Sequence, residues 1–189
     1  MDRGSLAAVI DHTNLYPDPS IAEIRELCGE ANEHGFHSVC VYSGDVATAR
    51  EAADDTVRVC AVAGFPHGKT LSRVKAEEAH QAVDAGADEI DMVINQTYVK
   101  SGRIKEAVED IRAVREAAPD VTLKVICETC NLSEDELVQA CRAAVRADAD
   151  FVKTSTGFGE YGARAEDIRV MRDALEEVNV SLGIKASGG

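Results

Sequence analysis

Three lysines and one aspartate are the residues of this sequence best placed to do chemistry, because each interrupts a short apolar run. Lys124, Lys153 and Lys185 make up three of the seven lysines, and Asp91 lies in the run EIDMVI. Stripping the water from an ammonium group costs several kcal/mol unless the group is paired or used. Each of these charged side chains therefore requires a partner or a function.

Schiff-base catalysis is a chemistry that lysines grouped in this way can perform. At about 6 Å and an effective dielectric constant near 20, two ammonium groups repel by roughly 3 kcal/mol, which lowers the pKa of one of them by about two units. Partial desolvation acts in the same direction. A neutral amine can then attack a carbonyl, and a nearby carboxylate such as Asp91 can move the protons that later steps require.

Plainer interpretations of the same residues stay open at this point. Lys153 is also explained as a lysine at a strand end whose side chain reaches solvent. Lys124 is also explained by a salt bridge to Glu128 or Asp91, and Asp91 by charge balance for the lysines. The five histidines show no ligand spacing and are expected to be loop or hydrogen-bonding residues.

Short apolar runs alternate with amphipathic segments along the whole chain, which predicts strands alternating with helices. The expected strands are 9–13, 38–42, 57–63, 88–94, 121–127, 149–158 and 180–185. The expected helices are 21–34, 44–53, 71–85, 103–117, 134–147 and 168–178. Ser20 with Glu23, and Ser133 with Glu136, have the spacing of capping boxes, and Gly35 marks a helix end.

Strict alternation leaves two α/β architectures, an open doubly wound sheet or a TIM (β/α)8-type barrel. Polar residues follow many strands here, as in a barrel, and no GxGxxG or GxxxxGK[ST] motif follows the first strand. We therefore expect one barrel domain over residues 1–189. Only seven strand–helix units are present or begun, so the last unit, roughly 25 to 30 residues, is apparently missing.

The composition limits which kinds of binding partner we expect for this protein. The 34 acidic residues outnumber the 20 basic ones, which makes nucleic acid an unfavourable partner. No apolar run approaches the length of a membrane span and no signal peptide opens the chain, so we expect no membrane contact and a cytoplasmic location. The acidic surface has two open explanations, adaptation to high salt or an ordinary acidic surface.

The six cysteines are expected to be free thiols that fill the core. Cys127 and Cys130 have CxxC spacing, but no second pair or histidine cluster accompanies them. The sequence therefore predicts no metal site.

Seven segments together resemble one family. In chain order they are IDHTNL, SVCVY, AGFPHG, GADEIDMVIN, LKVICETC, ADFVKTSTGFG and GIKASGG. The set, from Asp11 to Gly189, resembles the 2-deoxyribose-5-phosphate aldolases, which are class I aldolases on a TIM barrel. The resemblance implies reversible cleavage of 2-deoxy-D-ribose 5-phosphate to acetaldehyde and D-glyceraldehyde 3-phosphate, without a cofactor. It also implies a homo-oligomer acting on a small phosphorylated sugar.

The resemblance assigns roles by motif. Lys153 in FVKTSTGF corresponds to the Schiff-base nucleophile, Lys185 in GIKASGG to the neighbour that lowers its pKa, and Asp91 to a proton relay working through a water. The remaining residues that it places around the substrate are Asp11, Cys40, Lys124, Thr154, Ser155, Gly157, Gly188 and Gly189. The three glycines among them match places where backbone N–H groups approach the phosphate, which requires no metal.

Two alternative functions remain open on the sequence. One is another Schiff-base aldolase or a transaldolase on the same scaffold. The other is an inactive, truncated homologue that only binds or assembles, because the missing unit would supply half of the phosphate cradle and would cover the edge of the seventh strand.

Overall fold

Seven parallel strands form one curled sheet in the computed structural model, which describes residues 2–180 and 182–188. Each strand pairs with its neighbours in chain order. The strands are β1 (Asp11–Thr13), β2 (Ser38–Val41), β3 (Arg58–Ala63), β4 (Glu89–Val93), β5 (Thr122–Ile126), β6 (Phe151–Lys153) and β7 (Gly183–Lys185). The order never reverses, so the sheet has no switch point and is a (β/α) barrel with one unit missing.

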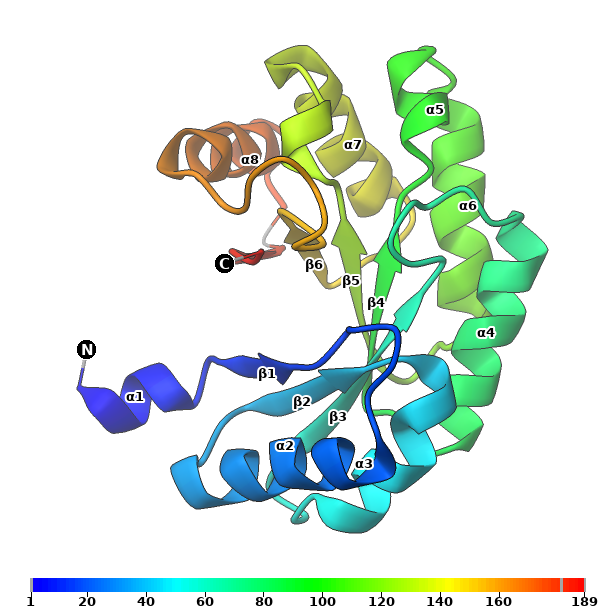
Figure 1. The fold of residues 1–189 in the computed structure, drawn as a ribbon. Coiled ribbons are helices and arrows are strands. Elements are labelled where there is room, and N and C mark those ends of the chain that lie inside the picture. The colour runs from blue at the N-terminus through cyan, green and yellow to red at the C-terminus, as the bar shows by residue number, and fades with distance from the viewer. Residues whose placement is uncertain (1, 181, 189) are drawn as a thin grey trace.

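Helices cover the outer face of the sheet, and Figure 1 shows the sheet curling so that an open side remains between β1 and β7. The helices are α1 (Arg3–Ala7), α2 (Ile21–His34), α3 (Val46–Ala52), α4 (Ser72–Asp84), α5 (Gln96–Lys100), α6 (Ile104–Ala117), α7 (Glu134–Arg146) and α8 (Ala165–Glu177). Two 3-10 turns, η1 (Ser43–Asp45) and η2 (Thr129–Asn131), follow β2 and β5.

Local signals in the sequence explain where the helices begin and end. Ser20 and Ser133 each accept a backbone hydrogen bond three residues on, and the glutamates at Glu23 and Glu136 bond back, which completes both predicted capping boxes. Gly35 ends α2 in the left-handed conformation at φ 65°. The short helices α1 and α5 were not predicted, because five residues are too few to show helical periodicity.

The two faces of the sheet differ in chemistry, as alternation along β4 shows. Ile90 and Met92 are fully buried in the main hydrophobic core, and Asp91 faces the opposite side. The inner face carries a small apolar cluster of Leu15, Cys40, Cys60 and Val62. The remainder of that inner face is free to hold charged side chains.

All seven predicted strands extend beyond the observed ones, and β6 and β7 differ most from their predictions. β6 ends at Lys153. Thr154 N–H still donates to the Lys185 carbonyl at 3.0 Å, but from Ser155 on the backbone bonds to side chains: Ser155 N–H donates to Ser187 Oγ at 3.1 Å, and Thr156 N–H to Glu128 at 3.2 Å. β7 begins only at Gly183. Residue Ser181 of the predicted strand 180–185 lies outside the described residues.

The thiols lie as expected, and all six cysteines are free. Cys127 is buried against Cys141, and the hydrogen bond with the Cys141 thiol, together with burial, raises the pKa of Cys127. Cys130 is only half-buried. The two cysteines of the CxxC motif thus contribute to packing. None of the described helices combines the length and apolar character needed to cross a membrane.

A buried ion pair fixes the outer layer beside β4. Lys75 on α4 and Asp110 on α6 are both fully buried, and their charged groups are 2.7 Å apart. The same ammonium donates to the Val93 carbonyl at 2.9 Å, and Ser72 Oγ donates to the carboxylate at 2.8 Å. Two helices are thereby tied to the end of the strand that carries Asp91.

We predict that Asp110→Ala lowers the free energy of unfolding by about 3–5 kcal/mol, because it leaves the Lys75 ammonium buried without a counter-charge. Glu109→Ala, on the same helix, removes the exposed pair with Lys105 and should cost less than about 1 kcal/mol. Denaturant unfolding measures both variants. Equal, small losses would contradict the proposed role of the buried pair.

Candidate active site

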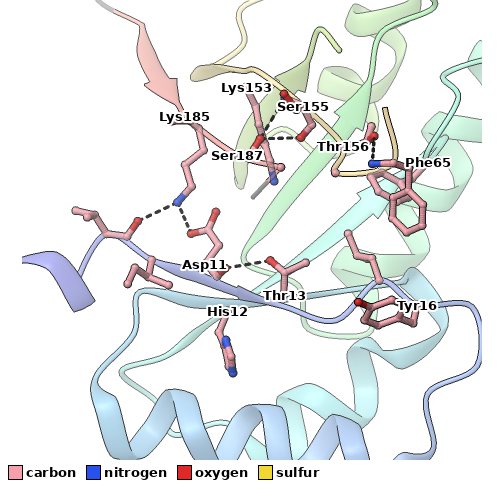
Figure 2. A pocket seen from close by; sticks show the side chains of 17 residues that line it. Asp11, His12, Thr13, Tyr16, Phe65, Lys153, Ser155, Thr156, Lys185 and Ser187 are labelled. Carbon is pink, nitrogen blue, oxygen red and sulfur yellow. Dashed lines mark hydrogen bonds and ion pairs between the residues drawn. The ribbon is translucent and has the colours of Figure 1, made fainter. Parts of the chain in front are cut away.

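A cavity of about 730 Å³ lies between β1 on one side and the ends of β6 and β7 on the other (Figure 2). Of the residues expected around a substrate, it is lined by Asp11, Lys153, Ser155, Gly157, Lys185 and Gly188. Aromatic rings of Tyr16, Phe65 and Phe158 also line it. The cavity therefore has a polar side built on strand ends and an apolar side built on loops.

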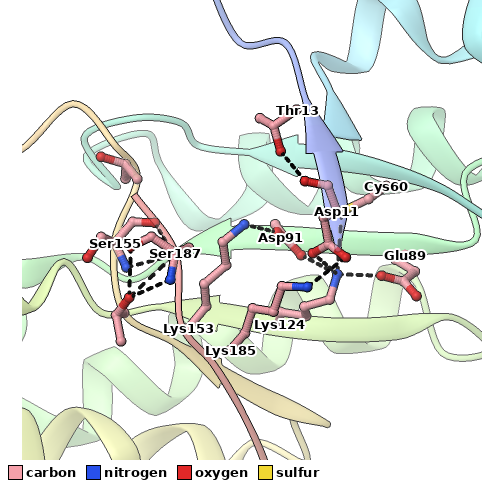
Figure 3. Close-up of polar contacts among 12 residues, drawn as sticks. Asp11, Thr13, Cys60, Glu89, Asp91, Lys124, Lys153, Ser155, Lys185 and Ser187 are labelled. Atoms are coloured by element: carbon pink, nitrogen blue, oxygen red, sulfur yellow. Dashed lines mark hydrogen bonds and ion pairs between the residues drawn. The ribbon is translucent and has the colours of Figure 1, made fainter. Parts of the chain in front are cut away.

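Asp91 bridges two lysines beneath this cavity (Figure 3). Its Oδ2 is 2.6 Å from Lys153 Nζ, and its Oδ1 is 2.8 Å from Lys124 Nζ. Lys153 is only 6% exposed, so the alternative of a lysine reaching solvent is wrong. The salt bridge expected for Lys124 is made to Asp91, whereas Glu128 binds elsewhere.

Two further carboxylates complete the charge balance. Glu89 contacts the Lys124 ammonium, and Asp11 Oδ1 is 2.7 Å from Lys185 Nζ. Lys185 reaches from β7 across to β1, where it also donates to the Val9 carbonyl at 3.0 Å. Together with Asp91, Lys124 and Lys153, these residues give the inner face three carboxylates and three ammonium groups.

The pKa values follow from this pairing. Burial alone would lower the pKa of Lys153, but the Asp91 carboxylate together with Cys40 and Cys60 outweighs it and raises that pKa. Burial likewise opposes the raised pKa of Lys124, which Cys60, Asp91 and Glu89 produce. For Asp91 burial acts to raise the pKa, and the two ammonium groups overcome it and lower the pKa.

The expected lowering of the Lys153 pKa by Lys185 is therefore wrong for this arrangement. The Lys185 ammonium is neutralised by Asp11, and Lys153 shares Asp91 with Lys124. Sequence reasoning counted the lysines and missed Glu89, although strand alternation places Glu89 on the same face as Asp91.

Glu128 holds the loop that follows Lys153. It is buried with φ 57°, and it accepts hydrogen bonds from the Thr156 N–H at 3.2 Å and from the Thr156 hydroxyl. The Thr156 hydroxyl oxygen in turn accepts the Phe158 N–H at 3.1 Å. The cavity-lining segment from Ser155 to Phe158 is thus ordered by one carboxylate that the sequence analysis considered only as a partner for Lys124.

Glycines let the two loops of the cavity pack closely. Gly157 and Gly188 have φ 89° and 83°, and a Cβ on Gly188 would lie 2.8 Å from the Ser155 Cβ. Ser187 Oγ, which accepts the Ser155 N–H, also donates to the Ser155 carbonyl at 2.7 Å. The approach of backbone to backbone at this end of the cavity requires glycine.

The other expected residues lie around this centre. Cys40 is buried on β2 in the inner cluster, outside the cavity lining. The Thr154 hydroxyl is turned toward the segment that follows β7, where it accepts the Ser187 N–H at 3.0 Å. Ser155 is buried at the cavity, and its hydroxyl has no hydrogen-bond partner among the described residues. Gly189 lies outside the described residues.

Two groups of side chains have donor atoms close enough to share a metal ion: Cys40, Cys60 and Asp91, and Asp11, His37 and Glu89. Both groups already contact lysine ammonium groups, Lys124 at 3.5 Å from Cys60 Sγ and Lys185 at Asp11. A divalent cation would have to displace these positive charges, so the donor sets do not fit one.

Comparison with protein families identifies the sequence pattern. Residues 1–189 match the model of a family described as DeoC/LacD family aldolase. The match covers the whole chain, including every strand that contributes to the cavity.

Solved structures with the same fold carry related descriptions. A protein of Coccidioides immitis assigned as a deoxyribose-phosphate aldolase is 40% identical with a TM-score of 0.97, over 100% of this chain and 75% of that one. QR15, an aldolase, is 37% identical with a TM-score of 0.91, and the match covers 97% of this chain and 81% of QR15. The deoxyribose phosphate aldolase of Aeropyrum pernix, described as a tetramer, is 29% identical with a TM-score of 0.86, over 100% and 79%.

We predict that Asp91→Asn lowers the free energy of unfolding at pH 7 by about 3–5 kcal/mol, because Lys124 and Lys153 lose their shared counter-charge. The folded-state pKa of Asp91 is depressed, so its contribution is fully present above about pH 5 and is lost as the pH falls further. The difference between wild type and variant should therefore shrink in acid.

Urea unfolding between pH 7 and pH 3 measures this difference. Asp120→Asn, at an exposed carboxylate, is the control and should match the wild type throughout. A difference that is small at pH 7, or that grows in acid, would contradict the role of Asp91 as a buried counter-ion.

Proposed function

The chain belongs to the DeoC/LacD family of aldolases, and from that premise we propose that it reversibly cleaves 2-deoxy-D-ribose 5-phosphate through a Schiff base on Lys153. The products are acetaldehyde and D-glyceraldehyde 3-phosphate. The observation that carries the proposal is the buried lysine at the cavity whose ammonium lies 2.6 Å from Asp91. The assignment of the C. immitis and A. pernix relatives as deoxyribose-phosphate aldolases supports the choice of substrate.

The reaction begins when the Lys153 ammonium, which Asp91 holds protonated in the resting protein, gives its proton to water. The resulting neutral amine attacks the aldehyde carbon of the open-chain sugar. The carbinolamine takes up a proton and loses water, which leaves a protonated imine. Loss of the proton from the C3 hydroxyl breaks the C2–C3 bond and releases the phosphorylated aldehyde, and the electron pair enters the enamine. Protonation at C2 and hydrolysis then release acetaldehyde and restore the amine.

Asp91 suits the charge changes of this sequence. The protonated imine carries the same positive charge as the ammonium that it replaces, so Asp91 stabilises it without rearrangement. Protons leave and return through this carboxylate and a water beside it, with Lys124 holding the other carboxylate oxygen at 2.8 Å.

The phosphate of the substrate is assigned to the glycine end of the cavity. Gly157 and Gly188 leave the backbone uncovered there, and the free Ser155 hydroxyl faces the same space. Backbone N–H groups bind phosphate without a metal. Asp11 and Lys185 lie along the sugar.

We assign the protein a place in deoxyribonucleotide catabolism, in the cytoplasm, as a homo-oligomer with one domain over residues 1–189. Six free thiols suit a reducing compartment, and the A. pernix relative is described as a tetramer. The acidic surface supports a preference for high salt, which activity measured with and without molar salt would test.

Borohydride added with acetaldehyde should reduce the imine and leave one ethyl group on Lys153 of the wild type. Lys153→Ala should form no adduct and should lose at least about a thousandfold in cleavage rate, whereas the exposed Lys105→Ala should retain both. Peptide mass spectrometry locates the adduct. An adduct that persists in Lys153→Ala would refute the assignment, and a captured lysine without sugar cleavage would favour the transaldolase or inactive-homologue alternatives.

Gly157→Ala should raise the KM for the phosphorylated sugar about tenfold, because an alanine at φ 89° is strained by 1–2 kcal/mol and shifts the loop. The kcat/KM for unphosphorylated 2-deoxyribose should stay unchanged. Gly29→Ala, in open space on α2, is the control. An equal effect on both substrates would argue against phosphate binding at Gly157.

A further inference from the structure

We propose that Glu89 is a positioning residue for the reaction, which acts through Lys124 to keep Asp91 available to Lys153. The inference rests on the proposed function, because it assigns a role relative to the Schiff-base lysine. Glu89 opens β4 two residues before Asp91, so both carboxylates point to the inner face of the sheet. Figure 3 shows Lys124 reaching between them.

Lys124 is shared by the two carboxylates. Its ammonium contacts Glu89, lies 2.8 Å from Asp91 Oδ1 and lies 4.0 Å from Asp11 Oδ2. All four side chains are almost completely buried. Without Glu89, the positive charge of Lys124 would fall mainly on Asp91 and would draw it away from Lys153.

Glu89 is itself held from outside the site. His37 Nε2 lies 2.9 Å from Glu89 Oε1, and Arg58 Nε lies 3.9 Å from the same atom. The His37 side chain is 38% exposed and the Arg58 side chain 53% exposed. A continuous series of polar contacts therefore runs from the partly exposed His37 through Glu89, Lys124 and Asp91 to Lys153.

Charge counting gives the direction of the effect. Burial acts to lower the pKa of Lys153, whereas Asp91, in direct contact with its ammonium, and the nearby Cys40 and Cys60 act to raise that pKa. Replacing Glu89 by an amide leaves three ammonium groups against two carboxylates, which disfavours the charged form of every lysine in the cluster. Lys153 should then lose its proton at a lower pH.

The test is the pH dependence of borohydride capture of acetaldehyde at Lys153, followed by mass spectrometry between pH 6 and pH 10. Glu89→Gln keeps a hydrogen-bond acceptor and removes the charge. Its capture profile should shift to lower pH by on the order of one unit, while kcat for sugar cleavage falls at least fivefold with little change in KM. A profile that superimposes on the wild type would show that Glu89 only stabilises the fold.

Two further variants test whether the effect of Glu89→Gln comes from the proposed positioning role. Glu89→Asp keeps the charge one methylene farther away, so it should lower kcat at least threefold without shifting the capture profile. An unchanged kcat in Glu89→Asp would overturn the positioning role. This test remains valid even if the Glu89→Gln variant does not fold. Glu30→Gln, which removes an exposed carboxylate bonded to His12, should match the wild type in both measurements.

Borohydride capture in the wild type distinguishes a failure of the Glu89 proposal from a failure of the proposed aldolase function. No capture at Lys153 in the wild type refutes the proposed function. Capture in the wild type with unaltered Glu89 variants leaves that function standing and refutes only the role of Glu89.

Discussion

The structure depends on charge balance among side chains that are almost completely removed from solvent. Three ammonium groups and three carboxylates meet on the inner face of the sheet, and each of them would cost several kcal/mol if it were buried alone. Asp91 is the centre of this arrangement because it contacts two lysines at once. The cluster stabilises a positive charge at Lys153 whether the charged group is an ammonium or a protonated imine. The site is therefore preorganised for the intermediate before a substrate enters.

Parallel pairing in chain order brings these residues together. Asp91 on β4 is in register with Lys124 on β5, and Lys153 on β6 is in register with Lys185 on β7. Side chains in register on parallel strands point to the same face, so Asp91 meets Lys124 directly. Lys153 and Lys185 are like charges, and their counter-ions come from more distant strands, Asp91 on β4 and Asp11 on β1. Outside the sheet, the buried pair of Lys75 and Asp110 ties the helices to the end of β4.

The sequence alone predicts the alternation of strands and helices, the inward direction of Asp91 and the grouping of the three strand lysines. It offers the pair of Lys124 and Asp91 as one alternative, but it does not predict the partner of Lys185. That partner is Asp11, near the other end of the chain, and only the curl of the sheet brings the two together. The resulting charge balance reverses the direction expected for the pKa of Lys153, because attraction to the carboxylates offsets the repulsion between the ammonium groups.

The charge state of Lys153 in the resting protein tests this account most directly. An NMR titration of the lysine side chains, with Lys153 assigned by comparison with Lys153→Met, reports the pKa of each amine. The account predicts that Lys153 remains protonated beyond the ordinary lysine range, held by Asp91. Titration of Lys153 well below that range, near neutral pH, would contradict a charge-balanced cluster.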